Sequence, residues 1–438
     1  MNKRILNLAI PNIISNLTVP LVGFVDLALM GHQNSDVFIG AVSLGSMIFM
    51  FIYSGFGFLR MGTSGFTAQA YGERSFEKSM SALSRALLVA AGAASLMIIL
   101  QNPLSWVIFK LIGGSADVEM YARRYFFIRI WAAPATLAIY SFTGWFLGMQ
   151  NARSPMVIAI TVNLLNVGFS IALVELFGMK ARGVALGTLL AQYCGLILSI
   201  VLFTKFYGKI VKYWRREAMM QLVGFKRFFR VNSDILIRTL LLTGTIFYFN
   251  AKSAAFGDEI LAVNSLLLQF LWIYSFFIDG FAFAAESLVG RYVGARHPQN
   301  LRKAVRMLFI WGIGISLPMT LVYHLGGDTI LHILTDNQNV FDAAQPFQFW
   351  TALIPVITFA AFLWDGIYVG ATASRTMRNA MILSSIAVFL PAFHLLEAPF
   401  GNHGLWFAMM VFMASRGIFL AIQARKAIFQ PVKETAEA

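Results

Sequence analysis

Long stretches of mostly apolar residues recur along the whole 438-residue chain and are separated by short polar segments. A helix needs roughly 20 apolar residues to cross the hydrocarbon core of a bilayer. The pattern predicts an all-α polytopic membrane protein with twelve transmembrane helices. The expected spans lie near residues 5–30, 37–60, 84–110, 122–150, 154–178, 183–205, 229–251, 259–283, 304–325, 344–371, 378–399 and 403–424.

The loops between these spans alternate in charge. Cations gather at the N-terminus, in the loops after the even-numbered spans and in the tail, whereas the loop after the ninth span carries Asp328, Asp336 and Asp342. The positive-inside rule then predicts that both termini and the even loops face the cytoplasm. The same rule accounts for the formal net charge of +14, so no nucleic-acid partner is expected.

Composition narrows the classes of function. The chain is 58% hydrophobic and only 12% charged, which leaves no room for a water-soluble catalytic domain. The six histidines lack metal-ligand spacing, the single Cys194 excludes an intramolecular disulfide, and no glycine-rich phosphate loop is present. We therefore expect no enzyme activity, no metal site, no cofactor and no use of ATP, which leaves transport driven by an ion gradient.

The two halves of the chain resemble each other at one fixed offset. The segment "DEILAVNS" begins 222 residues after "DVFIGAVS", and "YVG" ends 222 residues after "AYG". Six spans in each repeat keep the repeats parallel, and such repeats place a substrate site between the halves near the midplane. The predicted parts are an N-lobe (1–208), a cytoplasmic basic linker (209–226), a C-lobe (227–428) and a cytoplasmic tail (429–438). The alternative is an old duplication that is kept only for packing.

The first span contains a polar stripe inside an apolar run, "VPLVGFVDLALMGH". On a helix, Asn12, Asn16, Gly23 and Asp26 fall within about 80° of one another, so they face the bundle interior rather than lipid. Pro20 removes the amide that would bond to the carbonyl of Asn16, which predicts a hinge. Asp26 is thus a candidate proton or cation site, and the alternative is an interhelical hydrogen bond that only packs helices.

A second polar stripe is predicted in the fifth span, where Asn163, Asn166 and Ser170 share one face, and Thr188 follows in the sixth span. Burial favours the neutral form of a carboxyl group, whereas such donors favour its charged form. Together they would let Asp26 exchange a proton at physiological pH, as ion coupling requires. The alternative for the asparagines is a purely structural role between helices.

The second half carries its own acids at membrane depth. Asp279 lies in the eighth span and Asp365 in the tenth, and each is a candidate for binding an ion or a cationic substrate. The alternative is that they lie near the interface and are solvated. Glu286, nearest the basic eighth loop, is expected to be solvated.

Several segments resemble the multidrug and toxic compound extrusion family, specifically its DinF-like bacterial branch. They are "LAIPNIISNLTVPLVGFVDLALMGH", "FTAQAYG", "GWFLGMQNARSP", "NLLN", "GVALGTLLAQY", "DGFAFAAES", "YVGAR" and "LWDGIYVGATASRTMRNAM". The resemblance implies a twelve-helix antiporter of two six-helix lobes in the bacterial inner membrane. Such proteins export lipophilic or cationic small molecules on a proton or sodium gradient, and we expect a monomer.

The resemblance also assigns residues. It implies that Asp26 is the acid of the first helix whose protonation changes the bend of that helix, and that Asn163, Asn166 and Thr188 surround it. It further implies that Asp365 is similar to an acid that binds cations in the C-lobe.

One position departs from the family pattern. Many relatives carry Asp where this chain has Ser170, so Asp26 is the one clear acid at mid-depth in the N-lobe. A proton needs a single carboxylate, whereas sodium needs a cage of several oxygens. The sequence therefore favours proton coupling, with sodium coupling as the alternative.

Two further functions remain as rivals. A flippase for lipids or lipid-linked substrates would need a basic lateral groove. Few intramembrane cations are present, and most of them are expected near span ends: Arg60, Arg129, Arg238 and Arg416. A membrane-embedded enzyme would need clustered His/Asp or Ser/His near one interface, and the sequence has no such cluster.

Overall fold

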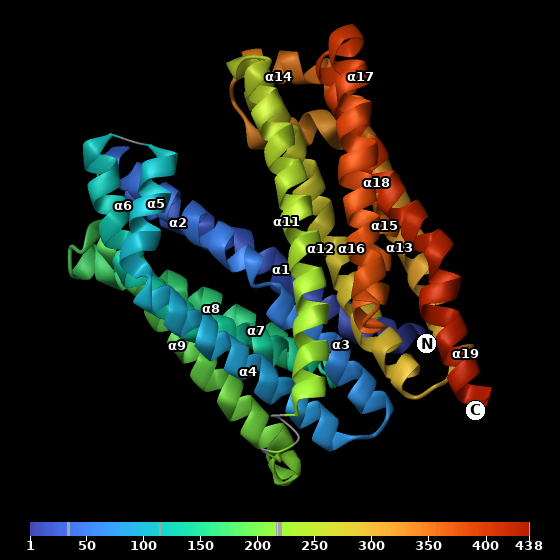
Figure 1. The fold of residues 1–438 in the computed structure, drawn as a ribbon. Helices are drawn as coiled ribbons and strands as arrows, with labels where there is room; N and C mark the ends of the chain where they lie inside the picture. The colour runs from blue at the N-terminus through green and yellow to red at the C-terminus, as the bar shows by residue number, and fades with distance from the viewer. Residues whose placement is uncertain (33–35, 114, 216, 218–220, 438) are drawn as a thin grey trace. The chain divides into compact units, whose positions relative to one another are not determined.

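The structure is a computed structural model that describes residues 1–32, 36–113, 115–215, 217 and 221–437. Every regular element among these residues is a helix (Figure 1). The α-helices are α1 (Asn2–Gly31), α2 (Asp36–Gly55), α3 (Phe58–Gly72), α4 (Phe76–Ile99), α5 (Gln101–Ile112), α6 (Ala116–Arg129), α7 (Ala133–Gly148), α8 (Arg153–Ile171), α9 (Lys180–Tyr207), α11 (Leu222–Ala255), α12 (Asp258–Gly294), α13 (Pro298–Leu334), α14 (Gln338–Ala344), α15 (Gln348–Gly370), α16 (Ser374–Ile382), α17 (Leu390–Phe400), α18 (Asn402–Ala424) and α19 (Gln430–Glu437).

Short 3₁₀ or π segments join or extend several of these helices. They are η1 (Ile130–Ala132), η2 (Ala172–Leu176), η3 (Gly208–Tyr213), η4 (Gln345–Phe347), η5 (Leu383–Phe389) and η6 (Arg425–Phe429). Because η6 runs directly into α19, the predicted tail is helical, and α19 packs against α13.

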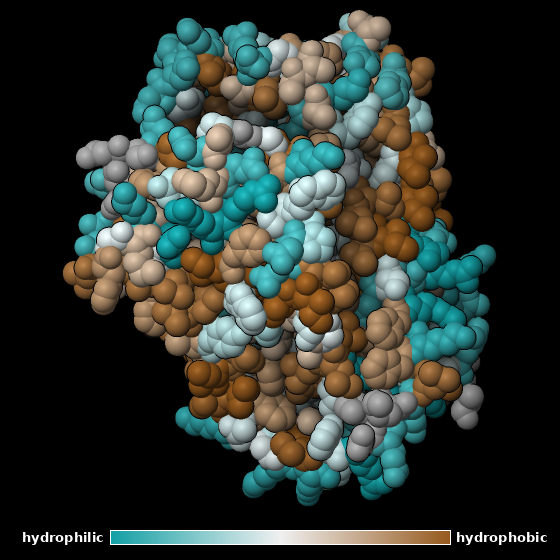
Figure 2. Space-filling view, turned by 60° about the vertical axis from the view of Figure 1, so that its left-hand side comes forward, coloured by the Kyte–Doolittle hydropathy of each residue, from teal (hydrophilic) through white to brown (hydrophobic). Residues whose placement is uncertain are grey.

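The predicted all-α membrane fold is confirmed. Eleven helices or joined helices among the described residues are long and apolar enough to cross a membrane. The remaining long helix, α11, has 34 residues but carries Asp234 and Arg238 in its interior, which lowers its hydropathy. Figure 2 shows broad hydrophobic areas on one face of the molecule. Leu111 and Leu176 are each 79% exposed, as expected for side chains that contact acyl chains instead of water.

The chain forms two compact units. The first contains residues 1–13 and 230–438, and the second contains residues 14–229. The start of α1 therefore groups with the second half of the sequence, whereas the predicted N-lobe was 1–208. Close helix packing explains this difference, because a side chain at Gly280 of α12 would collide with Ala9 and Ile13 of α1. The lobe boundaries stay a prediction, and residues 216 and 218–220 of the linker lie outside the described residues.

Matching close contacts in the two units support the internal repeat. A Cβ atom at Gly144 of α7 would collide with the backbone of Arg60 in α3. A Cβ atom at Gly366 of α15 would collide with the backbone of Ala282 in α12, and both residues are 222 positions further along. Each glycine is therefore required by a close approach of two helices, and the same approach occurs once in each unit.

Backbone conformation repeats at the same offset. Arg74 and Arg296 both adopt positive φ, at 58° and 53°, and so do Gln150 and Thr372, at 63° and 52°. The members of each pair follow equivalent helices. Arg74 and Arg296 come just after α3 and α12, and Gln150 and Thr372 come just after α7 and α15. The left-handed conformation is uncommon for residues other than glycine, so its recurrence indicates that the repeats share detailed turn geometry.

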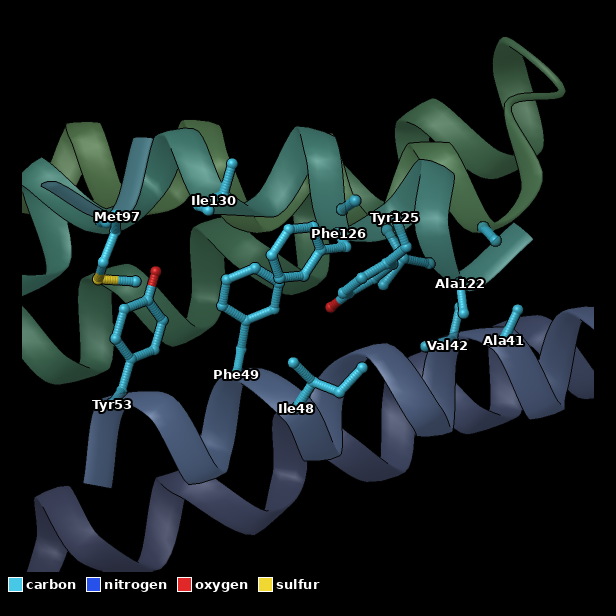
Figure 3. Close-up of a cluster of buried hydrophobic side chains, with 14 of the residues drawn as sticks. Ala41, Val42, Ile48, Phe49, Tyr53, Met97, Ala122, Tyr125, Phe126 and Ile130 are labelled. Carbon is cyan, nitrogen blue, oxygen red and sulfur yellow. The ribbon is translucent and has the colours of Figure 1, made fainter. Parts of the chain in front are cut away.

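A hydrophobic cluster joins α2, α4 and α6 inside the unit of residues 14–229 (Figure 3). The rings of Phe49 and Phe126 stack with centroids 5.4 Å apart. Tyr53 lies one turn further along α2, beside Met97 of α4 (Figure 3). This cluster fixes the α2 face that is next to the polar site described below.

Candidate functional site

Asp26 lies in the second half of α1, six residues after Pro20, in a helix long and apolar enough to span a membrane. The residue is only 7% exposed. Its Oδ1 atom is buried and has no hydrogen-bond partner among the described residues. An ionised carboxylate with an unsatisfied oxygen is costly at membrane depth, so this oxygen is a ready acceptor for a proton or an ion.

The immediate surroundings of Asp26 come from α8 and α6. The Ser170 hydroxyl and the Arg129 guanidinium both interact with the carboxyl group. Ser170 Oγ also donates to Asn166 Oδ1 at 3.4 Å, and both residues are buried. Gly187 of α9 approaches the Ser170 backbone so closely that a side chain there would collide. The structure thus brings together three of the predicted residues, namely Asp26, Asn166 and Ser170.

A second contact links the stripe on α8 to α1. Asn163 Nδ2 donates to Thr18 Oγ1 at 2.8 Å, and Thr18 Oγ1 donates to the carbonyl of Ser15 at 2.7 Å. Thr18 was not predicted as a site residue, although its place between Asn16 and Pro20 was a signal. This contact ties α8 to the turn of α1 that precedes Pro20.

The other predicted residues of this region are placed as follows. Thr188 is buried and donates to the carbonyl of Val184 in its own helix at 2.9 Å. Asn12 donates to the carbonyl of Leu8 at 2.6 Å and belongs to the other unit. Asn16 is half-buried. Pro20 lies within α1, whose helix continues without interruption from residue 2 to residue 31. The predicted hinge remains a prediction.

Arg129 is a functional candidate that the sequence argument did not select. Its guanidinium lies 5.4 Å from the ring centroid of Phe49 and 5.5 Å from that of Tyr53. Its Nη1 atom is buried without a hydrogen-bond partner among the described residues. The segment "RIWAAP" at the end of α6 gave no periodic signal, so only the fold shows that this cation lies near Asp26.

In the other unit, Asp365 of α15 forms an ion triad. Arg416 Nη2 of α18 lies 2.6 Å from Asp365 Oδ2, and Arg238 of α11 pairs with the same oxygen. The exposures are 6% for Asp365, 9% for Arg238 and 2% for Arg416. Arg238 and Arg416 are thus buried among helices, a placement that the sequence alone did not predict. Both guanidiniums are buried because a carboxylate on a neighbouring helix compensates them.

The remaining acids of this unit are also placed by the structure. Asp279 of α12 is half-buried and interacts electrostatically with Arg416. Glu286 is 1% exposed, so its predicted solvation was wrong, because α12 packs closely against α15 at this level. Asp234, which the sequence argument missed, is buried and accepts from Arg378 Nη1 at 2.5 Å and from Ser374 Oγ at 2.9 Å.

Within the part of the chain that the structure describes, no group of three or more His, Cys, Asp or Glu side chains could hold a metal ion. The polar groups placed around Asp26 and Asp365 are carboxyl groups, an amide, a hydroxyl and guanidiniums.

Comparison with known proteins identifies the family. A family model described as MatE matches residues 11–172 and 235–393. The chain is 36% identical to DNA damage-inducible protein F of Escherichia coli (strain K12) over 428 residues, 96% of this chain and 91% of that protein. The chain belongs to the MatE family.

More distant MatE relatives agree with this assignment. The chain is 22% identical to the probable multidrug resistance protein NorM of Thermotoga maritima over 375 residues, which is 81% of this chain and 78% of that protein. Two solved structures share the fold. One is a crystal structure of MATE in the bent conformation, with a TM-score of 0.87 at 17% identity over 100% of this chain and 97% of that one.

The second solved structure is the outward-facing conformation of a multidrug resistance MATE family transporter of the MOP superfamily. Its TM-score is 0.85 at 18% identity, over 99% of this chain and 96% of that one. MatE proteins are a family of membrane transporters, and the expected family and its DinF-like branch are confirmed. The family also agrees with the absence of a catalytic constellation in the sequence.

Proposed function

We propose that the protein is a proton-coupled antiporter that exports lipophilic, often cationic, small molecules, with Asp26 as the proton-binding group. The observation that carries the proposal is a buried carboxyl group with one oxygen unpartnered among the described residues, inside a membrane-spanning helix. The names of two relatives support the substrate class, since both are described as multidrug resistance proteins.

The surroundings of Asp26 suggest how a proton changes the structure. While the carboxyl group is ionised, it is stabilised by the Arg129 guanidinium and the Ser170 hydroxyl. Protonation removes its charge and turns an acceptor into a donor. The bonds between Asp26, Ser170 and Asn166 must then rearrange, and α1 bends at Pro20. Protonation thereby shifts the equilibrium between a straight and a bent α1 towards the bent form. The bend narrows the cavity, and the substrate leaves on the outer side as the transporter alternates access.

The surroundings of Asp365 argue against a binding site for a coupling cation in the C-terminal unit. Two guanidiniums already share this carboxylate, so a sodium ion or a cationic substrate there would meet net positive charge. We therefore assign Asp365 a structural role in charge compensation and leave Asp279 as the candidate acid of that unit for a cationic substrate.

The proposal also includes the location and orientation of the protein. The distribution of Lys and Arg in the loops supports a cytoplasmic position for both termini. The similarity to a protein of Escherichia coli supports a bacterial inner membrane as its location. The protein would act as a monomer, with the bilayer and its small-molecule substrates as partners.

Efflux from proteoliposomes tests the coupling. The wild-type protein is reconstituted with a fluorescent lipophilic cation, and a pH gradient or a sodium gradient is imposed separately. The proposal predicts that only the pH gradient drives efflux. Efflux driven by sodium alone would favour a sodium antiporter, and phospholipid movement without drug efflux would favour a flippase.

A further inference from the structure

An apolar groove runs along the outer side of α13, α15 and α18, all in the unit that contains residues 230–438. Its volume is about 670 Å³, and Arg306 is the one charged residue among those that line it. Aromatic rings form part of the wall, with Phe309 and Trp364 5.1 Å apart. Because it lies in helices that span the membrane, the groove opens on the acyl chains of the bilayer.

Small residues explain why the groove is not filled by side chains. Ala360 of α15 and Ala414, Gly417 and Ala421 of α18 lie along it. A Cβ atom at Gly417 would press on Ala360, so the two helices approach closely and leave a furrow above their contact.

One end of the groove is basic. Arg306 lies near the start of α13, and Arg302 precedes it by one helical turn. Phe429 lines the same end and belongs to η6, which packs against α13 and also carries Arg425 and Lys426. These four cations are exposed, and none of them forms an ion pair with another described residue.

Acidic side chains are sparse in the sequence around this end. Residues 298–313 of α13 and residues 414–433 of α18, η6 and α19 contain no Asp or Glu, and Glu434 is the first acid to follow. Asp365 is adjacent to the lining residue Trp364, but its carboxylate is already shared by two buried arginines. The four exposed cations at the mouth of the groove therefore outnumber the acid that is near them in the sequence, Glu434, and this excess attracts anions.

We propose that this groove binds an anionic phospholipid, with an acyl chain along the furrow and the phosphate on Arg306. A guanidinium can hold a phosphate through two parallel hydrogen bonds. Basic clusters where a transmembrane helix meets the cytoplasmic surface attract anionic headgroups. The occupant is a lipid and not a protein helix, since the groove is an apolar slot that ends in cations at the level of the headgroups.

Native mass spectrometry of the full-length protein in detergent tests the site. Phosphatidylglycerol and phosphatidylcholine with the same acyl chains are titrated separately, and the first tightly bound adduct is measured. The wild type should bind phosphatidylglycerol more tightly than phosphatidylcholine. Arg306→Gln should weaken phosphatidylglycerol binding about fivefold. It should weaken phosphatidylcholine binding less, because the cationic choline of that lipid offsets the charge of its phosphate. Arg306→Lys, which keeps the charge, should weaken phosphatidylglycerol binding less than Arg306→Gln does.

Two controls complete the experiment. Arg375→Gln removes an exposed cation of the same unit that does not line the groove, and it should bind both lipids like the wild type. Ala414→Phe fills the furrow and should lower the affinity for both lipids. Equal binding of the two lipids by the wild type, or equal effects of Arg306→Gln and Arg375→Gln, would overturn the proposal.

Discussion

The buried triad of Arg238, Asp365 and Arg416 makes a quantitative prediction about stability. Changing Asp365 to Asn keeps the shape of the side chain but leaves two guanidiniums, 9% and 2% exposed, without the carboxylate they share. Removing one partner of a buried ion pair typically costs about 3–5 kcal/mol, because the other charge stays buried. We therefore expect Asp365→Asn to destabilise the protein by about this amount.

The assay is thermal unfolding of the detergent-solubilised protein, followed by the loss of the monodisperse peak in size-exclusion chromatography. For a unit of this size the expected decrease in Tm is on the order of 10 °C. Asp336→Asn is the matched control, because Asp336 is an exposed acid of the same unit. Its Tm should stay close to that of the wild type.

A rescue variant tests whether uncompensated charge, rather than a change of side-chain shape, destabilises Asp365→Asn. Replacing both arginines by Met in the Asp365→Asn background removes the uncompensated charges and keeps apolar volume in the site. This triple variant should be more stable than Asp365→Asn alone, since well-packed apolar residues often replace buried ion pairs without loss. The reasoning is refuted if Asp365→Asn melts at the wild-type temperature, or if the triple variant is less stable than the single one.

Two further predictions concern helix packing. Gly366→Ala should destabilise the protein by about 1–3 kcal/mol, because its Cβ would collide with the backbone of Ala282. The control Gly314→Ala should be tolerated, because no atom lies within 4 Å of a Cβ at Gly314. Equal Tm values for the two variants would contradict the close packing at Gly366. Thr18→Val and Asn163→Ala each remove one partner of the hydrogen bond between α1 and α8, and each should lower Tm slightly. A double-mutant cycle should give a coupling free energy of about 0.6 kcal/mol. Strict additivity of the two effects would mean that this hydrogen bond contributes nothing to stability.

The sequence predicted the fold because its signals are local or repeat at a fixed distance. Apolar runs identify spans without any knowledge of neighbours, and the offset of 222 residues relates Gly144 to Gly366 directly. The position of Asp26 on a polar face followed from helical periodicity alone. Its burial in the structure agrees with that reasoning, because a carboxyl group in an apolar helix can only face protein or water.

The charge network of the C-terminal unit could not be predicted in the same way. Asp365 is 127 residues from Arg238 and 51 residues from Arg416, so their pairing depends on how three helices pack. Without that packing, most of the intramembrane arginines were expected near span ends, where they can reach water. Glu286 was misplaced for the same reason, since its burial depends on the close contact of α12 with α15.

Arg129 illustrates a different limit. It ends α6 and contacts the aromatic side chains Phe49 and Tyr53 of α2, and its charge acts on Asp26 of α1. Three separate helices are needed to bring these groups together. No spacing within a single segment indicates such an arrangement, although the aromatic residues and the cation were each visible in the sequence.

The most direct test of the central claim is efflux by the Asp26→Asn variant in proteoliposomes with an imposed pH gradient. Asn keeps the size and hydrogen-bonding capacity of a protonated carboxyl group but cannot release a proton. The account predicts a folded protein that still binds substrate, as measured by fluorescence polarisation, but shows no efflux driven by the gradient. Efflux at the wild-type rate by a folded Asp26→Asn protein would show that Asp26 is not the coupling group.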